Sequence, residues 1–416
     1  MKRKFVAALA ATAVVLSMAA CSSGGDDANS PVTLRYAIWD PSMQPAVQKI
    51  VNKFEESHKN VTIKIETTGF GPYWTKLETA VKSGTAPDLF WMNAPNFGLY
   101  QQSGKLAELD SAGADSLSHQ AKQAVGMFTA SDGAHYGMPF FYDAIGLWYN
   151  KKIFDDAGVS YPDSSWTWDD YLAAAKELTD PAKGIYGGAA PVANQEGYYN
   201  TIFQAGGEII NKSKTKSGFD SAEAQAGIQF WVDLLKSGAS PSLQQLSETN
   251  ASDQFISGKV AMVWWESSSL NGFLQADALK GNLAVAPLPK GKERATVTHS
   301  LSVVVSKDSK HLKAAQEFQD FTGTKEAAQL FAEGGNLSSY DGMETVWEKQ
   351  APDVDLSVFP DSLAYAQPYP ATNNTSAWQS LESKYLTPAY DGSTTVADAT
   401  KQLAAAINKV LAAEKH

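Results

Sequence analysis

The chain has 416 residues, of which 44% are hydrophobic and 11% aromatic, and its formal net charge is -11. This length allows two domains or two lobes, and the composition is that of a soluble globular protein. The negative charge argues against nucleic acid as a partner, because binding to a phosphate backbone depends on lysine and arginine.

The first residues predict a secretory signal peptide over 1–20. A basic segment is followed by an apolar run and by small residues just before Cys21. The apolar run is too short to span a membrane comfortably. Cys21 is the only cysteine, so no intramolecular disulfide can form, and its position predicts lipidation after cleavage. Met18 stands where bacterial lipoprotein signals more often have leucine, so an ordinary signal peptide with an incidental Cys21 is the alternative.

Residues 22–30 predict a flexible tether between the lipid and the folded body. The segment contains no apolar residue larger than alanine and cannot join a core. Residues 1–20 carry three positive charges and no negative one, so their removal changes the net charge to -14. We expect the mature protein to be held by its lipid at the extracellular face of the cell membrane.

The segment 32–92 predicts alternating strands and helices. Strands are expected at 32–39, 61–66 and 89–92, and helices at 45–57 and 74–81. The strand at 89–92 is a continuous apolar run, which is typical of a strand buried on both faces of a parallel sheet. The order β-α-β-α-β predicts an α/β fold.

Further elements follow along the rest of the chain, without an internal repeat. Strands are expected at 145–149, 260–265, 283–288 and 302–305. Helices are expected at 169–178, 222–235, 312–321 and 396–411, where apolar residues recur at helical spacing. No further segment is apolar and long enough to span a membrane.

The composition favours a neutral ligand that is rich in hydroxyl groups. Arginine occurs only as Arg3, Arg35 and Arg294, whereas sites for phosphate or carboxylate usually present the bidentate fork of arginine. The chain has 11 Trp and 16 Tyr, although most of them must fill hydrophobic cores. Aromatic rings can stack on the C–H faces of sugars, and Asp, Asn, Glu and His can bind their hydroxyls.

Polar and aromatic side chains stand at the ends of the predicted strands, where ligands bind in open α/β sheets. The candidate ligand-binding residues are Trp39, Asp40, Asn93, Asn96, Tyr142, Asp143, Trp264, Trp265, Glu266, His299, Ser300 and Asn336. Adjacent side chains of a strand point to opposite faces. One of Trp264 and Trp265 is therefore expected at the ligand and the other in a core.

Several candidates also have a purely structural interpretation. These are core packing for Trp39, a turn for Asp40, a lysine pair for Asp143, a local hydrogen bond for His299 and a helix C-cap for Asn336. Lesser candidates on expected loops are Tyr73, Tyr198, Tyr199 and Tyr369.

Five motifs are spread over nearly the whole mature chain. They are Ala86-Pro87-Asp88-Leu89-Phe90, the run from Tyr149-Asn150-Lys151 to Gly158, Trp166-Thr167-Trp168, the pattern Phe255-x-x-Gly258-Lys259-x-Ala261-Met262, and Pro287-Leu288-Pro289. Each motif alone is common. Together, and with the predicted lipoprotein start, they resemble the family-1 extracellular solute-binding proteins that serve ABC sugar importers.

The resemblance implies a periplasmic-binding-protein-like fold, with a ligand cleft between two α/β lobes that are joined by crossing segments. By this resemblance the N-terminal lobe comprises 31–143 and 297–340, and the C-terminal lobe comprises 144–296 and 341–416. Asn93, the pair Tyr142-Asp143 and the run 264–266 resemble ligand-contacting positions of the family. We expect a monomer that binds a di- or oligosaccharide without a cofactor or metal and delivers it to membrane permease subunits.

Rival functions remain open. Motifs for a Ser or Cys nucleophile, a Walker loop or a zinc site are absent, but a secreted glycoside hydrolase needs only two carboxylates, which Asp40, Asp143 or Glu266 could supply. The same fold could bind a polyamine or a polyol phosphate. An adhesin would not need paired polar and aromatic residues at strand ends. We expect a binding protein without catalytic residues.

Overall fold

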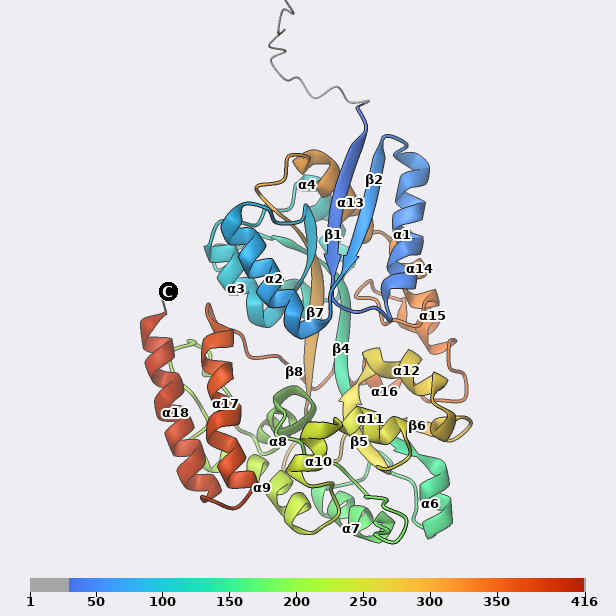
Figure 1. Ribbon diagram of the computed structural model, residues 1–416, viewed down its shortest axis with the longest axis vertical. Helices are drawn as coiled ribbons and strands as arrows, with labels where there is room; N and C mark the ends of the chain where they lie inside the picture. The colour runs from blue at the N-terminus through green and yellow to red at the C-terminus, as the bar shows by residue number, and fades with distance from the viewer. Residues whose placement is uncertain (1–29, 415–416) are drawn as a thin grey trace, which may run out of the picture.

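The protein consists of two lobes stacked along its long axis, as the computed structural model shows for residues 30–414 (Figure 1). The predicted signal peptide, Cys21 and nearly all of the predicted tether lie outside these described residues. None of the helices within 30–414 combines the length and the apolar character needed to cross a bilayer.

The upper lobe of Figure 1 contains the predicted β-α-β-α-β unit. Its elements are β1 (Val32–Ile38), α1 (Gln44–Ser57), β2 (Val61–Thr67), α2 (Phe70–Ser83) and β3 (Leu89–Asn93). Strand β1 lies between β2 and β3 and is parallel to both. All five residues of β3 are buried, as expected for an inner strand of a parallel sheet.

Helices from two distant parts of the chain complete the upper lobe. They are α3 (Ala94–Gln102), α4 (Ser111–Ser116), α5 (Lys122–Met127), α13 (Leu312–Thr322) and α14 (Lys325–Glu333). Phe318 of α13 packs against Tyr36 of β1 and Phe54 of α1. The apolar face of α13 therefore closes a single core with the opening segment of the chain.

Strands β4 (Gly137–Asn150) and β7 (Thr296–Val305) connect the lobes. They pair antiparallel from Gly137 opposite Val304 to Ala144 opposite Thr298, and β7 also pairs with β3 in the upper lobe. From Ile145 onward, β4 pairs instead with β5 (Met262–Glu266) and β6 (Leu283–Ala286) of the lower lobe. We propose that the lobes divide within this strand pair, at the boundaries expected from the sequence.

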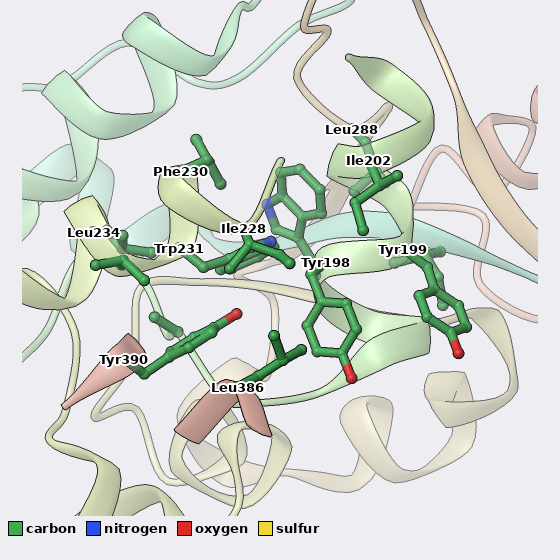
Figure 2. Packing of buried hydrophobic residues seen from close by; sticks show 14 of the residues in the cluster. Tyr198, Tyr199, Ile202, Ile228, Phe230, Trp231, Leu234, Leu288, Leu386 and Tyr390 are labelled. Atoms are coloured by element: carbon green, nitrogen blue, oxygen red, sulfur yellow. The ribbon is translucent and has the colours of Figure 1, made fainter. Parts of the chain in front are cut away.

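The lower lobe is mainly helical. Its helices are α6 (Lys151–Ala157), α7 (Trp168–Leu178), α8 (Tyr199–Gln204), α9 (Ala222–Lys236), α10 (Leu243–Glu248), α11 (Ala251–Ile256), α12 (Leu270–Gln275), α15 (Glu344–Glu348), α16 (Val358–Ser362), α17 (Thr375–Tyr390) and α18 (Val396–Ala413). The short strand β8 (Ala366–Pro368) pairs with β7. Figure 2 shows the core where Ile202, Ile228, Trp231, Leu386 and Tyr390 pack together.

Candidate functional site

Three polar side chains meet where β4 and β7 pass between the lobes. Asp143 of β4 lies opposite His299 of β7, and Glu266 ends β5 opposite Ile145, two residues further along β4. An oxygen of Asp143, an oxygen of Glu266 and a ring nitrogen of His299 all lie within 4.8 Å of one another. The sheet register therefore brings together three of the residues predicted from the sequence; we call them the hinge cluster.

Asp143 is fixed by one oxygen and has the other oxygen free. Its Oδ1 accepts hydrogen bonds from the backbone N–H of Ser267 (2.7 Å), from the Ser267 hydroxyl and from the N–H of Ala144 (2.8 Å). The side chain is fully buried, and Oδ2 has no hydrogen-bond partner within residues 30–414. A buried carboxylate oxygen without a partner costs free energy, so this atom is poised to accept a ligand hydroxyl or N–H group.

A π-helical turn, Asn194–Tyr198, extends the hinge cluster. Gln195 donates a hydrogen bond from Nε2 to Glu266 Oε1 (2.8 Å), and the same nitrogen lies 2.7 Å from His299 Nδ1. Glu196 is hydrogen-bonded to the carboxyl group of Glu266.

The environment of the hinge cluster favours neutral side chains. Burial, together with the charges of Asp143 and Glu196, raises the pKa of Glu266 well above its usual range. Burial also raises the pKa of Glu196. For His299, burial lowers the pKa, although the nearby charge of Asp143 opposes this effect. The two glutamates are therefore protonated more readily than in water, as closely spaced carboxyl groups are.

Glu382 of α17 stabilises the turn Asn194–Tyr198 by hydrogen bonds. The hydroxyls of Tyr198 and Tyr199 and the side-chain amide of Asn194 all donate hydrogen bonds to its carboxylate. Burial raises the pKa of this carboxyl group to about 7. Asn200 ties the same turn to β7, because it donates to the carbonyl of Gln195 and accepts from the N–H of Val297.

The two adjacent tryptophans of β5 point to opposite faces, as predicted. Trp264 is only 3% exposed and packs against Tyr171, Phe230 and Trp231 in the core of the lower lobe. Trp265 is half-buried, and its Nε1 donates to the hydroxyl of Ser269. Of the two, Trp265 is therefore the one available to a ligand.

Aromatic rings gather at the carboxyl end of β1. Trp39 is half-buried and contacts Phe70, Tyr73, Trp74 and Trp91 at centroid distances of 5.1–5.7 Å. Phe70 is 54% exposed, the largest value among the exposed large hydrophobic residues of the described chain. Sequence reasoning predicted Trp39 but missed Phe70, which the exposed start of α2 presents.

Asp40 has a local structural role. Its Oδ1 accepts hydrogen bonds from the N–H and the hydroxyl of Ser42, both at 2.7 Å, and so forms the turn that leads into α1. No contact joins it to the hinge cluster within residues 30–414. Asp40 therefore forms the turn that was considered from the sequence, and its role in ligand binding stays a prediction.

Asn93 and Asn96 lie at the carboxyl end of β3. Asn93 caps α3 and accepts hydrogen bonds from the N–H and the side-chain amide of Asn96. Asn93 pairs with Leu301 of β7. Leu301 lies two residues from His299, which corresponds to about 7 Å along the strand. Asn93 therefore lies on the strand next to the one that carries His299.

The remaining candidates are mostly satisfied inside the fold. Ser300 is fully buried and donates its hydroxyl hydrogen bond to the carbonyl of Phe141 (2.7 Å). Asn336 is 1% exposed and bonds to the carbonyls of Phe331 and Gly334, the helix-end role considered from the sequence. Tyr142 is 7% exposed beside the hinge cluster. The lesser candidates Tyr73, Tyr198, Tyr199 and Tyr369 are all buried.

Sequence reasoning missed Gln195, Glu196 and Glu382. The run Asn194-Gln195-Glu196-Gly197 before two tyrosines was a usable signal, because so polar a segment next to aromatic residues is unusual in a loop. Glu382 gave no signal, since one glutamate on a helix usually faces solvent. The lysine pair considered for Asp143 is not among the ion pairs of residues 30–414.

The chain is similar to known binding proteins over most of its length. Residues 40–329 match the family model of bacterial extracellular solute-binding proteins. The diacetylchitobiose-binding protein DasA of Streptomyces coelicolor is 25% identical over 442 aligned residues, covering 100% of both chains. The maltodextrin-binding protein MdxE of Bacillus subtilis is 25% identical over 351 residues, covering 80% of each chain.

Solved structures share the fold. An ABC substrate-binding protein of Listeria monocytogenes, in complex with cycloalternan, has a TM-score of 0.87 and 28% sequence identity, covering 92% of this chain and 100% of that one. The GacH receptor of Streptomyces glaucescens has a TM-score of 0.81 and 22% identity, with coverage of 92% and 100%. The two-lobed α/β fold predicted from the sequence is thus confirmed.

Proposed function

Because this chain belongs to the family of bacterial extracellular solute-binding proteins, we propose that it captures a di- or oligosaccharide and delivers it to an ABC importer. One observation carries the proposal most directly. The hinge cluster places an unpaired carboxylate oxygen of Asp143, the side chain of Glu266 and His299 between two lobes. Sugar hydroxyls are suitable partners for such groups, because each can donate and accept a hydrogen bond.

The names of the relatives support a sugar as the ligand. They include proteins that bind diacetylchitobiose, maltodextrin and arabinooligosaccharides, and a structural neighbour is bound to cycloalternan. The half-buried rings of Trp265 in the lower lobe and Trp39 in the upper lobe, and the exposed ring of Phe70, could stack on sugar faces. Rings in both lobes favour a ligand of more than one sugar unit.

Ligand binding would act by shifting the balance between open and closed lobes. A sugar held by Asp143, Glu266 and Trp265 at the hinge and in the lower lobe, and by Trp39 and Phe70 in the upper lobe, would contact both sets of residues only when the lobes are closed. Its differential affinity for the closed state sets how far it shifts the equilibrium. The closed form would then dock on the permease subunits.

The cellular placement follows from the N-terminal sequence. We propose that cleavage before Cys21 leaves a lipid-anchored monomer at the extracellular face of the membrane, with residues 22–30 as tether. Labelling of the expressed protein with a palmitate analogue tests this placement. Cys21→Ser should abolish the label and release the protein into the medium, and an unchanged label would contradict lipidation at this residue.

Trp265→Ala should weaken sugar binding by about 1–3 kcal/mol, because a stacking surface is lost from the ligand side of β5. Calorimetric titration with the best sugar of the panel described below measures the effect. Tyr161→Ala, which removes a 40% exposed ring beside α6, is the matched control and should bind as the parent does. Equal affinity in Trp265→Ala and in the parent protein would remove Trp265 from the proposed site.

Asp143→Asn should weaken binding by about 1.5–3 kcal/mol, the contribution of a hydrogen bond to a charged group. The amide can keep its oxygen on Ser267 and Ala144, but it presents an N–H donor where the free carboxylate oxygen stood. The same titration measures the loss. Asp353→Asn, at an exposed carboxylate, should have no effect, and binding by Asp143→Asn as tight as in the parent would exclude Asp143 as a ligand contact.

The proposed function is tested by titrating the protein that lacks residues 1–30 with neutral glucosides, galactosides, mannosides and xylosides of two or more units. Spermidine and glycerol phosphate are controls for the rival ligands. Saturable heat from one sugar class, with the sugar recovered intact, supports the proposal. Heat from a control alone would replace the sugar by a polyamine or polyol phosphate, and recovery of a cleaved sugar would favour a glycoside hydrolase.

A further inference from the structure

The hinge cluster carries negative charge that no basic side chain compensates. None of the ion pairs formed by lysine or arginine within residues 30–414 includes Asp143, Glu196 or Glu266. Asp143 is fully buried, and the two glutamates are half-buried. Carboxylates removed from water without a counter-charge are unfavourable, so without a cationic ligand these side chains can reduce their charge only by binding protons.

The free oxygen of Asp143 provides an independent sign that a ligand completes the site. Its Oδ2 is buried and has no hydrogen-bond partner within the described chain, although Oδ1 of the same carboxylate has three. Native proteins rarely leave a buried acceptor unpaired. A hydroxyl from a neutral sugar would satisfy its hydrogen bond but would leave the charge uncompensated.

From this arrangement we infer that the hinge cluster selects a saccharide that carries a free, protonated amino group, which lies between Asp143 and Glu266. The inference rests on the proposed sugar-binding function and specifies the ligand class. A primary ammonium nitrogen about 2.8 Å from two carboxylate oxygens holds them about 4.6 Å apart, because its N–H bonds are tetrahedral. The observed oxygens of Asp143 and Glu266 lie within 4.8 Å of each other.

A metal ion fits the hinge cluster less well than an ammonium group. The side-chain nitrogen of Gln195 donates to Glu266 and also faces Nδ1 of His299. The neutral ring of His299 therefore carries its proton on Nε2 and has no lone pair left for a metal. In this tautomer His299 can donate a hydrogen bond to a sugar oxygen next to the amino group.

The test compares amino, N-acetylamino and hydroxyl forms of the same sugars by calorimetric titration of the protein that lacks residues 1–30. The probes are glucosamine, N-acetylglucosamine and glucose, the corresponding galacto and manno trios, and chitobiose with diacetylchitobiose and cellobiose. The amino form should bind at least about 10-fold more tightly than its acetylated and hydroxyl partners, because two charge-assisted hydrogen bonds are lost in each. Glu266→Gln should reduce this preference, and Glu177→Gln, at an exposed carboxylate, should preserve it.

The outcomes separate this inference from the proposed function. Tighter binding of an acetylated or hydroxyl sugar, or binding of neutral sugars from the wider panel without any amino sugar, overturns the inference and leaves sugar binding intact. Saturable heat from calcium or manganese chloride alone that Glu266→Gln abolishes also overturns it, in favour of a metal site. Binding of spermidine with no response to any sugar removes the proposed function as well.

Discussion

Trp264→Ala should lower the free energy of unfolding by about 3–5 kcal/mol, the range for truncating a large buried aromatic residue. The ring lies in the core of the lower lobe, with its centroid 4.9 Å from that of Trp231 and 5.8 Å from that of Phe230. Relaxation cannot fill the space, because the neighbouring rings are themselves fixed in the core. Denaturant titration followed by circular dichroism measures the loss.

Trp265→Ala is the control for this stability measurement. The ring of Trp265 is half-buried, so its removal should lower the free energy of unfolding far less. The two variants should therefore differ in which property they lose. Trp264→Ala should lose stability but keep the sugar affinity of its folded fraction. Trp265→Ala should lose sugar affinity but keep its stability. A Trp264→Ala protein as stable as the parent would show that the ring is not a core residue.

Glu382→Gln should remove a pH dependence of stability of about 3 kcal/mol, because each unit of pKa shift corresponds to about 1.4 kcal/mol. Burial raises the pKa of Glu382 from its ordinary value of 4.5 to about 7 in the folded protein. Between these pH values the folded protein holds a proton that the unfolded chain has released. The contribution of Glu382 to stability is therefore unchanged below about pH 4.5, falls as the pH rises to about 7, and stays at its low value above that.

The measurement is the free energy of unfolding at pH 4.5 and at pH 8, in the parent and in Glu382→Gln. Other titrating groups contribute equally to both proteins and cancel in the comparison. Glu177→Gln, on the exposed face of α7, should reproduce the pH dependence of the parent. Identical pH dependence in Glu382→Gln and the parent would mean that this carboxyl group is ionised in the fold in the same range as in the unfolded chain.

Seven of the eight strands of residues 30–414 could be predicted at least in part, and six of the helices, because their patterns are local. The apolar run at β3 and the helical spacing in α1 and α9 need no knowledge of the rest of the fold. Only residues 145–149 of β4 and 302–305 of β7 were predicted. The other halves carry the polar residues Asp143, His299 and Ser300, of which Asp143 and Ser300 are buried and His299 is half-buried. α17 was missed although its buried residues recur every three or four positions, because the polar residues Thr375 and Glu382 interrupt the apolar face and Pro388 lies inside the helix.

The structure brings together three of the residues predicted from the sequence, Asp143, Glu266 and His299, and their role in ligand binding stays a prediction. Glu266 ends β5 as expected, whereas Asp143 and His299 lie inside the long strands β4 and β7 rather than at strand ends. The sequence did not show which candidates stabilise the fold rather than bind a ligand. Their hydrogen-bond partners are far away in the sequence or lie at the end of a helix. Ser300 bonds to Phe141, and Asn336 bonds to the end of α14. Gln195 reaches Glu266 and His299 because it lies in the turn Asn194–Tyr198, which no periodicity of the sequence predicts.

Strand β7 joins the upper sheet late in synthesis, although it lies between strands that are made early. The upper sheet places β7 between β3 and β4, so this lobe lacks a central strand until residue 305 has been synthesised. The upper lobe can therefore fold only after β7 has been made, although its first strands are made early. A fragment that ends before β7 would expose the unpaired edge of β3 and should aggregate rather than fold.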